Sequence, residues 1–149
     1  LKRLNSNLLL LYTGIQRNAN AVASNYVHKL SNEKEKNVRK IISNVELGEK
    51  MIKLGNIDDF GKLLHDAWIE KKELSKSITN HKIDELYKTS IQNGALGGKL
   101  LGAGGGGFML VYIAKEKQKS FLNKIKNITN IPFNFSNKGC EIILNSLKK

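Results

Sequence analysis

The chain of 149 residues is 40% hydrophobic and 26% charged, which is typical of a globular protein. Its formal net charge of +12 permits nucleic-acid binding, but the lysines are spread along expected helix faces, so we favour a solvated surface and no nucleic-acid partner. The sequence has no apolar run near the roughly 20 residues of a membrane span, no signal segment and a single cysteine, Cys140, so we expect a cytoplasmic protein without an internal disulfide.

We expect residues 1–149 to form a single domain, because this length suits one hydrophobic core. The first residue is Leu1 and not a methionine, so we expect a fragment of a longer protein. The three histidines fall on three different expected helices and have no partner at a metal-ligand spacing. We therefore expect no metal site.

A short apolar run at residues 8–12, closed by Thr13 and Gly14, predicts a buried strand that ends in a turn. Four helices are expected after it, because apolar residues recur at helical spacing at 19–30, 33–54, 58–74 and 79–93. Asn80 is a typical N-cap for the last of these helices.

The expected inward faces of two helices contain residues of interest. Ile42 and Val45 belong to the apolar face of the helix at 33–54. Lys71 falls in register with the apolar face of the helix at 58–74. His65 lies on or near that face, and we interpret it as a packed, hydrogen-bonded histidine rather than as a substrate ligand.

The second half of the chain is richer in expected strands. Strands at 99–101 and 108–113 flank a glycine-rich loop, and a helix that includes 120–128 leads to two closing strands at 132–135 and 140–144, joined by a turn at 137–139. The order is one strand, four helices, two strands, one helix and two strands. This order predicts an α+β fold, with helices packed on an antiparallel sheet.

The glycine-rich loop is the most unusual part of the sequence, since seven of the 13 glycines fall within 97–107. Glycine adopts positive φ freely and lets a ligand or another backbone approach closely. Amides exposed at such a bend can form an anion-binding concavity. The alternative is a flexible hairpin tip outside the core, where glycines can be replaced without loss of the fold.

The common phosphate-binding motifs do not explain this loop. Gly102, Gly104 and Gly107 match the spacing of the dinucleotide-binding fingerprint, but a strand follows where that fingerprint needs a helix. A P-loop needs Ser or Thr after its Gly-Lys pair, and here Leu100 follows Lys99. The loop therefore belongs to neither class.

The stretch from Gly98 to Phe108, GKLLGAGGGGF, closely resembles the third motif of the GHMP kinases, a family that includes galactokinase, homoserine kinase and mevalonate kinase. Segments 11–17, 65–68 and 83–87 look most like the bacterial heptose 7-phosphate kinases of that family. The resemblance covers essentially the whole chain, as the C-terminal domain of such an enzyme. It implies a ferredoxin-like antiparallel sheet with a helical insertion between the first two strands.

The resemblance also implies a function for the full-length protein. That function is ATP-dependent phosphoryl transfer to a sugar, with heptose 7-phosphate as the favoured acceptor and its anomeric oxygen as the attacked position, in the synthesis of nucleotide-activated heptose for surface polysaccharide. ATP and Mg²⁺ are implied to be held mainly by an N-terminal kinase domain in cis. No catalytic residue is expected in this chain, and the fragment alone is expected to be inactive.

The expected substrate- and phosphate-binding residues are Gly102, Ala103, Gly104, Gly105, Gly106, Gly107, Lys99, Thr13 and Arg17. The amides of the four consecutive glycines suit positioning and charge stabilisation. Thr13 and Arg17 lie where a strand ends and a helix begins, a position that suits an anion. Either Arg17 or Lys99 is expected to hold the acceptor's own phosphate.

Three alternatives remain open at this point. The full-length protein is a fucokinase-like or galactokinase-like enzyme, because such kinases share much of the pattern. The chain is a basic nucleic-acid-binding module that uses its lysine-rich helix and the glycine loop. Or it is a stand-alone regulatory domain without catalysis.

Overall fold

The computed structural model describes residues 1–125, 127–136 and 138–139. Its helices and strands are, in chain order, α1 (Lys2–Ser6), β1 (Leu8–Tyr12), α2 (Ala19–Ser24), α3 (Glu35–Leu54), α4 (Ile57–Lys72), α5 (His81–Gln92), β2 (Ala95–Leu100), β3 (Phe108–Ile113), α6 (Lys115–Lys124) and β4 (Thr129–Ile131). Two short 3-10 turns, η1 (Val27–Lys29) and η2 (Lys76–Ile78), precede α3 and α5.

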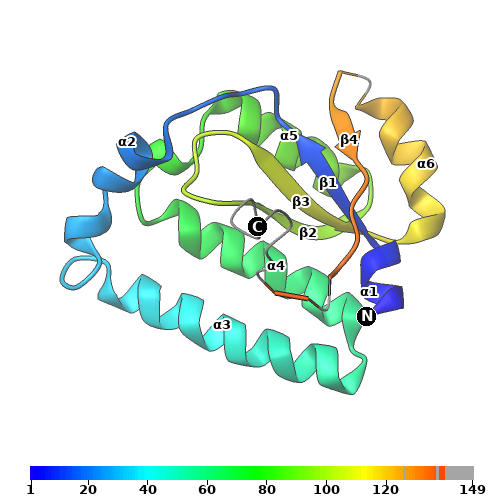
Figure 1. Ribbon diagram of the computed structural model, residues 1–149, viewed down its shortest axis with the longest axis horizontal. Helices are drawn as coiled ribbons and strands as arrows, with labels where there is room; N and C mark the ends of the chain where they lie inside the picture. The colour runs from blue at the N-terminus through cyan, green and yellow to red at the C-terminus, as the bar shows by residue number, and fades with distance from the viewer. Residues whose placement is uncertain (126, 137, 140–149) are drawn as a thin grey trace, which may run out of the picture.

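The four described strands form one sheet in the order β2-β3-β1-β4, and every neighbouring pair is antiparallel (Figure 1). The chain crosses from β1 to β2 through α2 to α5, and from β3 to β4 through α6. This strand order with two helical crossovers is the split βαβ arrangement of ferredoxin-like folds. The α+β prediction, the antiparallel sheet and the helical insertion between the first two strands are confirmed.

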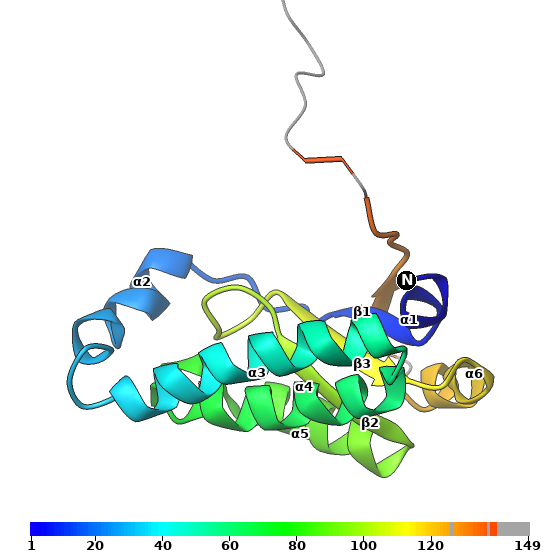
Figure 2. The same ribbon diagram turned by 90° about the horizontal axis from the view of Figure 1, so that it is seen from below.

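Two buried clusters lie on the two faces of the sheet, because successive side chains of a strand point to opposite sides. The larger cluster joins one face to α5 and α6 and to Trp68 of α4; its buried members include Leu9, Leu11, Val111, Ile83 and Phe121. The smaller cluster joins the other face to α1 and α4; its buried members are Leu4, Leu8, Ile57, Leu64 and Tyr112. Helix α3 lies along α4, as both views show (Figures 1 and 2).

The close packing of α4 on β2 depends on two glycines. A Cβ atom on Gly97 would collide with the carbonyl oxygen of Gly61, and one on Gly61 would lie 2.7 Å from Cγ of Tyr112. Only glycine lets the helix and the strand approach this closely. The strand expected at 99–101 starts too late, since β2 begins at Ala95 and includes Gly97 and Gly98.

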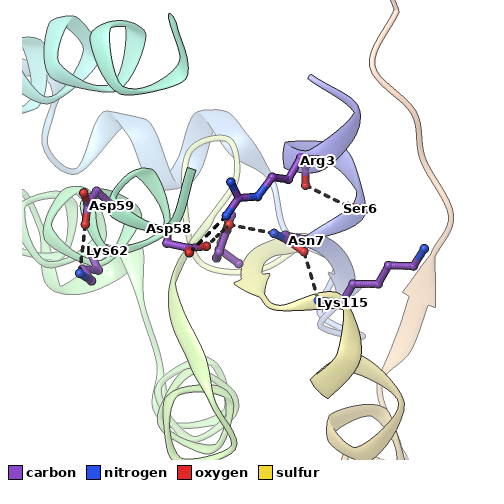
Figure 3. A network of polar contacts seen from close by, with 8 residues as sticks. Arg3, Ser6, Asn7, Asp58, Asp59, Lys62 and Lys115 are labelled. Atoms are coloured by element: carbon purple, nitrogen blue, oxygen red, sulfur yellow. Dashed lines mark hydrogen bonds and ion pairs between the residues drawn. The ribbon is translucent and has the colours of Figure 1, made fainter. Parts of the chain in front are cut away.

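A polar network closes the end of the sheet that lies opposite the glycine loop (Figure 3). The Tyr112 hydroxyl donates to Asp58 Oδ1 at 2.7 Å and accepts from Asn7 Nδ2 at 2.9 Å. Burial and the hydrogen bond to Asp58 raise the pKa of Tyr112 to about 12. The network ties β3 to α4 and to the residue after α1.

Other expected elements need correction. The helix expected at 19–30 is divided into α2 and η1, and the helix that includes 120–128 starts earlier, at Lys115, and ends at Lys124. The strand expected at 132–135 is wrong, because β4 ends at Ile131, directly before Pro132, which has no N–H to donate to a ladder. The strand expected at 140–144 lies outside the described residues, as does Asn137 of the expected turn. On α3, Ile42 and Val45 are 55% and 69% exposed and do not face the core.

Candidate functional site

The glycine loop, residues 101–107, connects β2 to β3 and lies beside the segment that follows β1, where the yellow-green and blue ribbons meet in Figure 1. Four of its glycines have positive φ: Gly102 at 69°, Gly104 at 108°, Gly105 at 75° and Gly107 at 91°. Side chains with a Cβ rarely adopt this region. The concentration of glycine is thus required by the path of the loop itself.

The loop is packed against the protein and is not a free tip. Gly104 and Gly106 are buried. A Cβ on Gly104 would lie 2.8 Å from Cα of Ile78, and one on Gly106 would lie 2.7 Å from the carbonyl oxygen of Ile15. The expectation of a hairpin tip outside the core is wrong, because the segments after β1 and around η2 enclose the loop.

The carbonyl oxygens along the loop are held by donors from other parts of the chain. The hydrogen bonds are Lys71 Nζ to Leu100 O at 2.9 Å and to Gly102 O at 2.6 Å, Tyr26 Oη to Ala103 O at 3.3 Å, Arg17 Nε to Gly104 O at 2.6 Å, Asn80 Nδ2 to Gly105 O at 3.2 Å, and Thr13 Oγ1 to Gly107 O at 2.8 Å. The loop is therefore fixed at nearly every peptide by residues far away in the sequence.

The loop amides divide into two groups. Gly105 N donates to Ile78 O at 2.8 Å, and Gly107 N donates to Ile15 O at 3.0 Å. Within the described part of the chain, the amides of Gly102, Ala103, Gly104 and Gly106 have no hydrogen-bond acceptor. Of the four glycine amides expected to face an anion, two are thus already occupied, and the neighbouring Ala103 adds an unoccupied one.

A cavity of about 490 Å³ lies beside the loop. Its lining combines an aromatic pair with polar and loop residues: Tyr12, Phe108, Ile15, Gln16, Arg17, Leu101, Gly102 and Gly107. The rings of Tyr12 and Phe108 are paired across β1 and β3 with centroids 5.3 Å apart, and Phe108 is 40% exposed. Arg17, which donates to Gly104 O, therefore also lines this cavity.

Thr13 and Lys99 do not line that cavity. Thr13 is buried, and its hydroxyl donates to Gly107 O and accepts from Ile15 N, so its single proton is used inside the protein. Lys99 lines a separate, mostly apolar cavity of about 410 Å³ between α3 and α4. Burial lowers the pKa of Lys99. Arg17 and Lys99, which the sequence offered as equal candidates for binding the acceptor's phosphate, thus line different cavities.

Lys71 was not among the expected site residues, although it is bound directly to the loop. Burial, together with the nearby charges of Lys99 and Arg17, lowers the pKa of Lys71 to about 8. The sequence did carry a signal: a lysine in register with the apolar face of the helix at 58–74. The hydrogen bonds of Tyr26 and Asn80 to the loop were not predicted, because the sequence shows no comparable pattern at these two residues.

His65 has the structural role expected of it. Its Nδ1 lies 2.6 Å from Tyr87 Oη, and the two rings are stacked with centroids 5.9 Å apart. Burial, with a contribution from Asp66, raises the pKa of Tyr87 to about 12. In the part of the chain that the structure describes, no three His, Cys, Asp or Glu side chains are grouped as metal ligands. None of the described helices has the length and apolar character needed to span a membrane.

The sequence is similar to those of known kinases. The chain is 29% identical over 143 residues to the D-glycero-alpha-D-manno-heptose 7-phosphate kinase of Campylobacter jejuni, a match that covers 91% of this chain and 41% of the relative. It is 31% identical over 127 residues to the bifunctional fucokinase/GDP-fucose pyrophosphorylase of Arabidopsis thaliana, covering 80% of this chain and 12% of the relative. The chain thus spans less than half of the length of these relatives.

The fold is shared with a solved kinase structure as well. Mevalonate kinase of L. major superposes with a TM-score of 0.69 at 20% identity, over 83% of this chain and 40% of that one. The family described as "GHMP kinases C terminal" matches residues 35–128, which include α3 to α6 and the whole glycine loop. The chain therefore belongs to the GHMP kinase family and corresponds to its C-terminal domain.

Proposed function

We propose that residues 1–149 are the C-terminal domain of an ATP-dependent sugar kinase, which transfers a phosphoryl group to the anomeric oxygen of heptose 7-phosphate. The observation that carries the proposal is the set of unoccupied amides at Ala103, Gly104 and Gly106. They lie on a loop whose carbonyl oxygens are bound by side chains of other segments, among them Arg17. The heptose specificity is supported by the Campylobacter jejuni relative, which matches 91% of this chain.

The chemistry of the loop fits phosphate. Phosphoryl transfer depends mainly on positioning and on stabilising the charge spread over the phosphate oxygens. Preorganised amides and a guanidinium supply both without reorganisation during the reaction. The side chains bound to the loop are neutral or cationic, whereas Mg²⁺ prefers carboxylates. We therefore assign the metal and the group that deprotonates the sugar to an N-terminal domain in cis, across a cleft from this loop.

Arg17 is our candidate for the residue that binds the acceptor's own phosphate. One of its nitrogens, Nε, is used to hold Gly104 O, and the rest of the guanidinium lies against the loop: Nη2 is 2.9 Å from the position of a Cβ on Gly102. The same cavity contains Tyr12 and Phe108, whose apolar ring faces suit the carbon skeleton of a sugar. Lys99, in the cavity between α3 and α4, is the less favoured anchor.

The proposal is tested on the full-length protein with heptose 7-phosphate, fucose and galactose as acceptors. We expect turnover with the sugar phosphate, and we expect Arg17→Ala to raise its KM by about tenfold to a hundredfold while the KM for ATP changes little, because one charge-assisted contact is lost. Arg17→Lys should also impair binding, since lysine lacks the planar fork.

Arg39→Ala is the matched control, because Arg39 is exposed on α3 and its ion pair among the described residues is with Glu35. It should leave both KM values unchanged. Preferred turnover of an unphosphorylated sugar would replace the heptose assignment with a fucokinase-like or galactokinase-like one. Equal rises in both KM values for Arg17→Ala would contradict the role given to Arg17.

A further inference from the structure

We propose that Lys71 is a positioning residue of this kinase: its ammonium fixes the Gly102–Ala103 peptide so that the Ala103 amide points to the phosphate. Lys71 lies near the end of α4, and its Nζ donates to Leu100 O at 2.9 Å and to Gly102 O at 2.6 Å. It thus bridges the last residue of β2 and the first left-handed glycine of the loop. The identity of the anion rests on the proposed function, whereas the two contacts do not.

The geometry of the peptide bond links the contact between Lys71 and Gly102 O to the direction in which the Ala103 N–H points. A trans peptide is planar, so the N–H of one residue points away from the carbonyl of the residue before it. With Gly102 O held by Lys71, the N–H of Ala103 must point away from Lys71. Tyr26 sets the Gly104 amide in the same way through Ala103 O, and Asn80 sets the Gly106 amide through Gly105 O. Three of the four unoccupied amides, those of Ala103, Gly104 and Gly106, therefore each follow a carbonyl that a side chain holds.

Lys71 is the charged member of these three donors, and within the described residues its charge has no carboxylate partner. The charged groups that act on the pKa of Lys71 are Lys99 of β2 and Arg17, which are both cations. The adjacent Glu70 is bound to Lys40 at 2.6 Å, and the adjacent Lys72 pairs with Asp84 at 3.3 Å. No ion pair joins Lys71 to a carboxylate among the residues described. The ammonium therefore leaves positive charge directly behind the loop, where a bound phosphate gains from it.

The test uses full-length protein labelled with ¹⁵N-alanine, so that the Ala103 amide is read directly. In the wild type we expect this resonance to shift as the pH passes through about 8, where Lys71 loses its proton. Lys71→Met, which keeps an unbranched side chain but removes the ammonium and both of its hydrogen bonds, should move the Ala103 resonance and abolish the titration. Lys71→Arg should restore most of the wild-type position.

Kinetics supply the second readout. Lys71→Met should lower kcat by about tenfold to a hundredfold, which is less than the roughly hundredfold to thousandfold loss that follows removal of a preorganised donor itself, while the KM for the sugar phosphate changes much less. Lys72→Met is the matched control: Lys72 is the next residue of the same helix, but it pairs with Asp84 and lies 5.7 Å from the centre of the Trp68 ring. It should change neither kcat nor the Ala103 resonance.

The outcomes are distinguishable from a failure of the proposed function. A full-length protein that phosphorylates no sugar defeats the kinase assignment, but the titration of Ala103 still decides the role of Lys71. If Lys71→Met does not fold, the wild-type titration and Lys71→Arg carry the test. A resonance of Ala103 that does not respond to pH near 8, or that responds equally in Lys72→Met and Lys71→Met, overturns the inference.

Discussion

Thr13 donates two hydrogen bonds to a single oxygen, the carbonyl of Gly107: one from its backbone N at 2.9 Å and one from Oγ1 at 2.8 Å. The same hydroxyl accepts from Ile15 N at 3.3 Å, and Gly107 N returns a bond to Ile15 O at 3.0 Å. The end of β1 and the end of the glycine loop are thus joined through one threonine side chain.

Replacing Thr13 by valine should destabilise the fold by about 1–3 kcal/mol, because the shape is kept while buried polar groups lose a partner. The residue is 2% exposed, so water does not replace the lost bonds. Thr13→Ser keeps the hydroxyl and should recover most of the loss. Urea denaturation of the three proteins measures the effect, and equal stabilities for the valine and serine variants would show that the hydroxyl does not matter.

The loop glycines allow backbone strain and packing to be separated. Gly107 has φ 91°, but a Cβ atom placed on it would meet no atom within 4 Å, whereas Gly106 has no positive φ but its Cβ would meet Ile15 O at 2.7 Å. We expect Gly107→Ala to lose about 1–2 kcal/mol from strain and Gly106→Ala about 1–3 kcal/mol from overpacking. Gly104→Ala should suffer both losses, because Gly104 has φ 108° and also lies against Ile78.

Calorimetric or urea unfolding of the three alanine variants checks this order. The expectation, drawn from the sequence, that the domain folds after such replacements stays a prediction, to which these losses of stability are added. Gly104→Ala no less stable than Gly107→Ala would mean that the loop moves away from Ile78 at little cost.

The sequence predicted elements whose signal is local. The strand at 8–12, the N-cap at Asn80 and the strand at 108–113 all came from apolar pattern or capping chemistry within a few residues, and the structure confirms them. The start of β2 was missed, because Gly97 and Gly98 are poor strand formers. The reason for Gly97 lies in α4, where a Cβ would collide with Gly61 O, whereas a Cβ on Gly98 would lie 2.6 Å from Leu110 O of β3.

The site was predicted less completely than the fold. A glycine-rich motif locates the loop, but it does not say which amides remain unoccupied, since that depends on acceptors such as Ile78 O and Ile15 O. It also gives no distances, so Arg17 and Lys99 looked equivalent although they line different cavities. The contacts of Lys71 join residues that are 29 and 31 positions apart, beyond the reach of any local pattern.

The stability of the fold should rise with pH above about 8. The pKa of Lys71 lies near 8 in the folded state, below its ordinary 10.5, so between these values the unfolded chain binds more protons than the folded one. Stability increases with pH wherever the unfolded state binds more protons. The raised pKa values of Tyr87 and Tyr112, about 12 against an ordinary 10.0, reverse this trend above about pH 10, because the unfolded tyrosines then lose protons first.

Urea unfolding at a series of pH values checks this profile. Lys71→Met should flatten the rise between about pH 8 and 10, leaving only the smaller part that comes from the lowered pKa of Lys99. Tyr87→Phe should reduce the fall at higher pH. An unchanged rise in Lys71→Met would show that Lys71 does not titrate differently in the folded and unfolded states.

The chain of 149 residues, expressed alone, should fold and yet bind Mg-ATP no more tightly than about 1 mM, which corresponds to about 4 kcal/mol. Folding is expected because both faces of the sheet are already covered by buried clusters. Weak binding is expected because the loop offers ATP a few amides, and the side chains bound to the loop in the described part of the chain include no carboxylate for Mg²⁺. Calorimetry with Mg-ATP and with inorganic pyrophosphate measures both affinities. Micromolar binding of Mg-ATP, or phosphorylation of heptose 7-phosphate by this chain alone, would mean that the nucleotide and metal sites lie within these residues and not in an N-terminal domain.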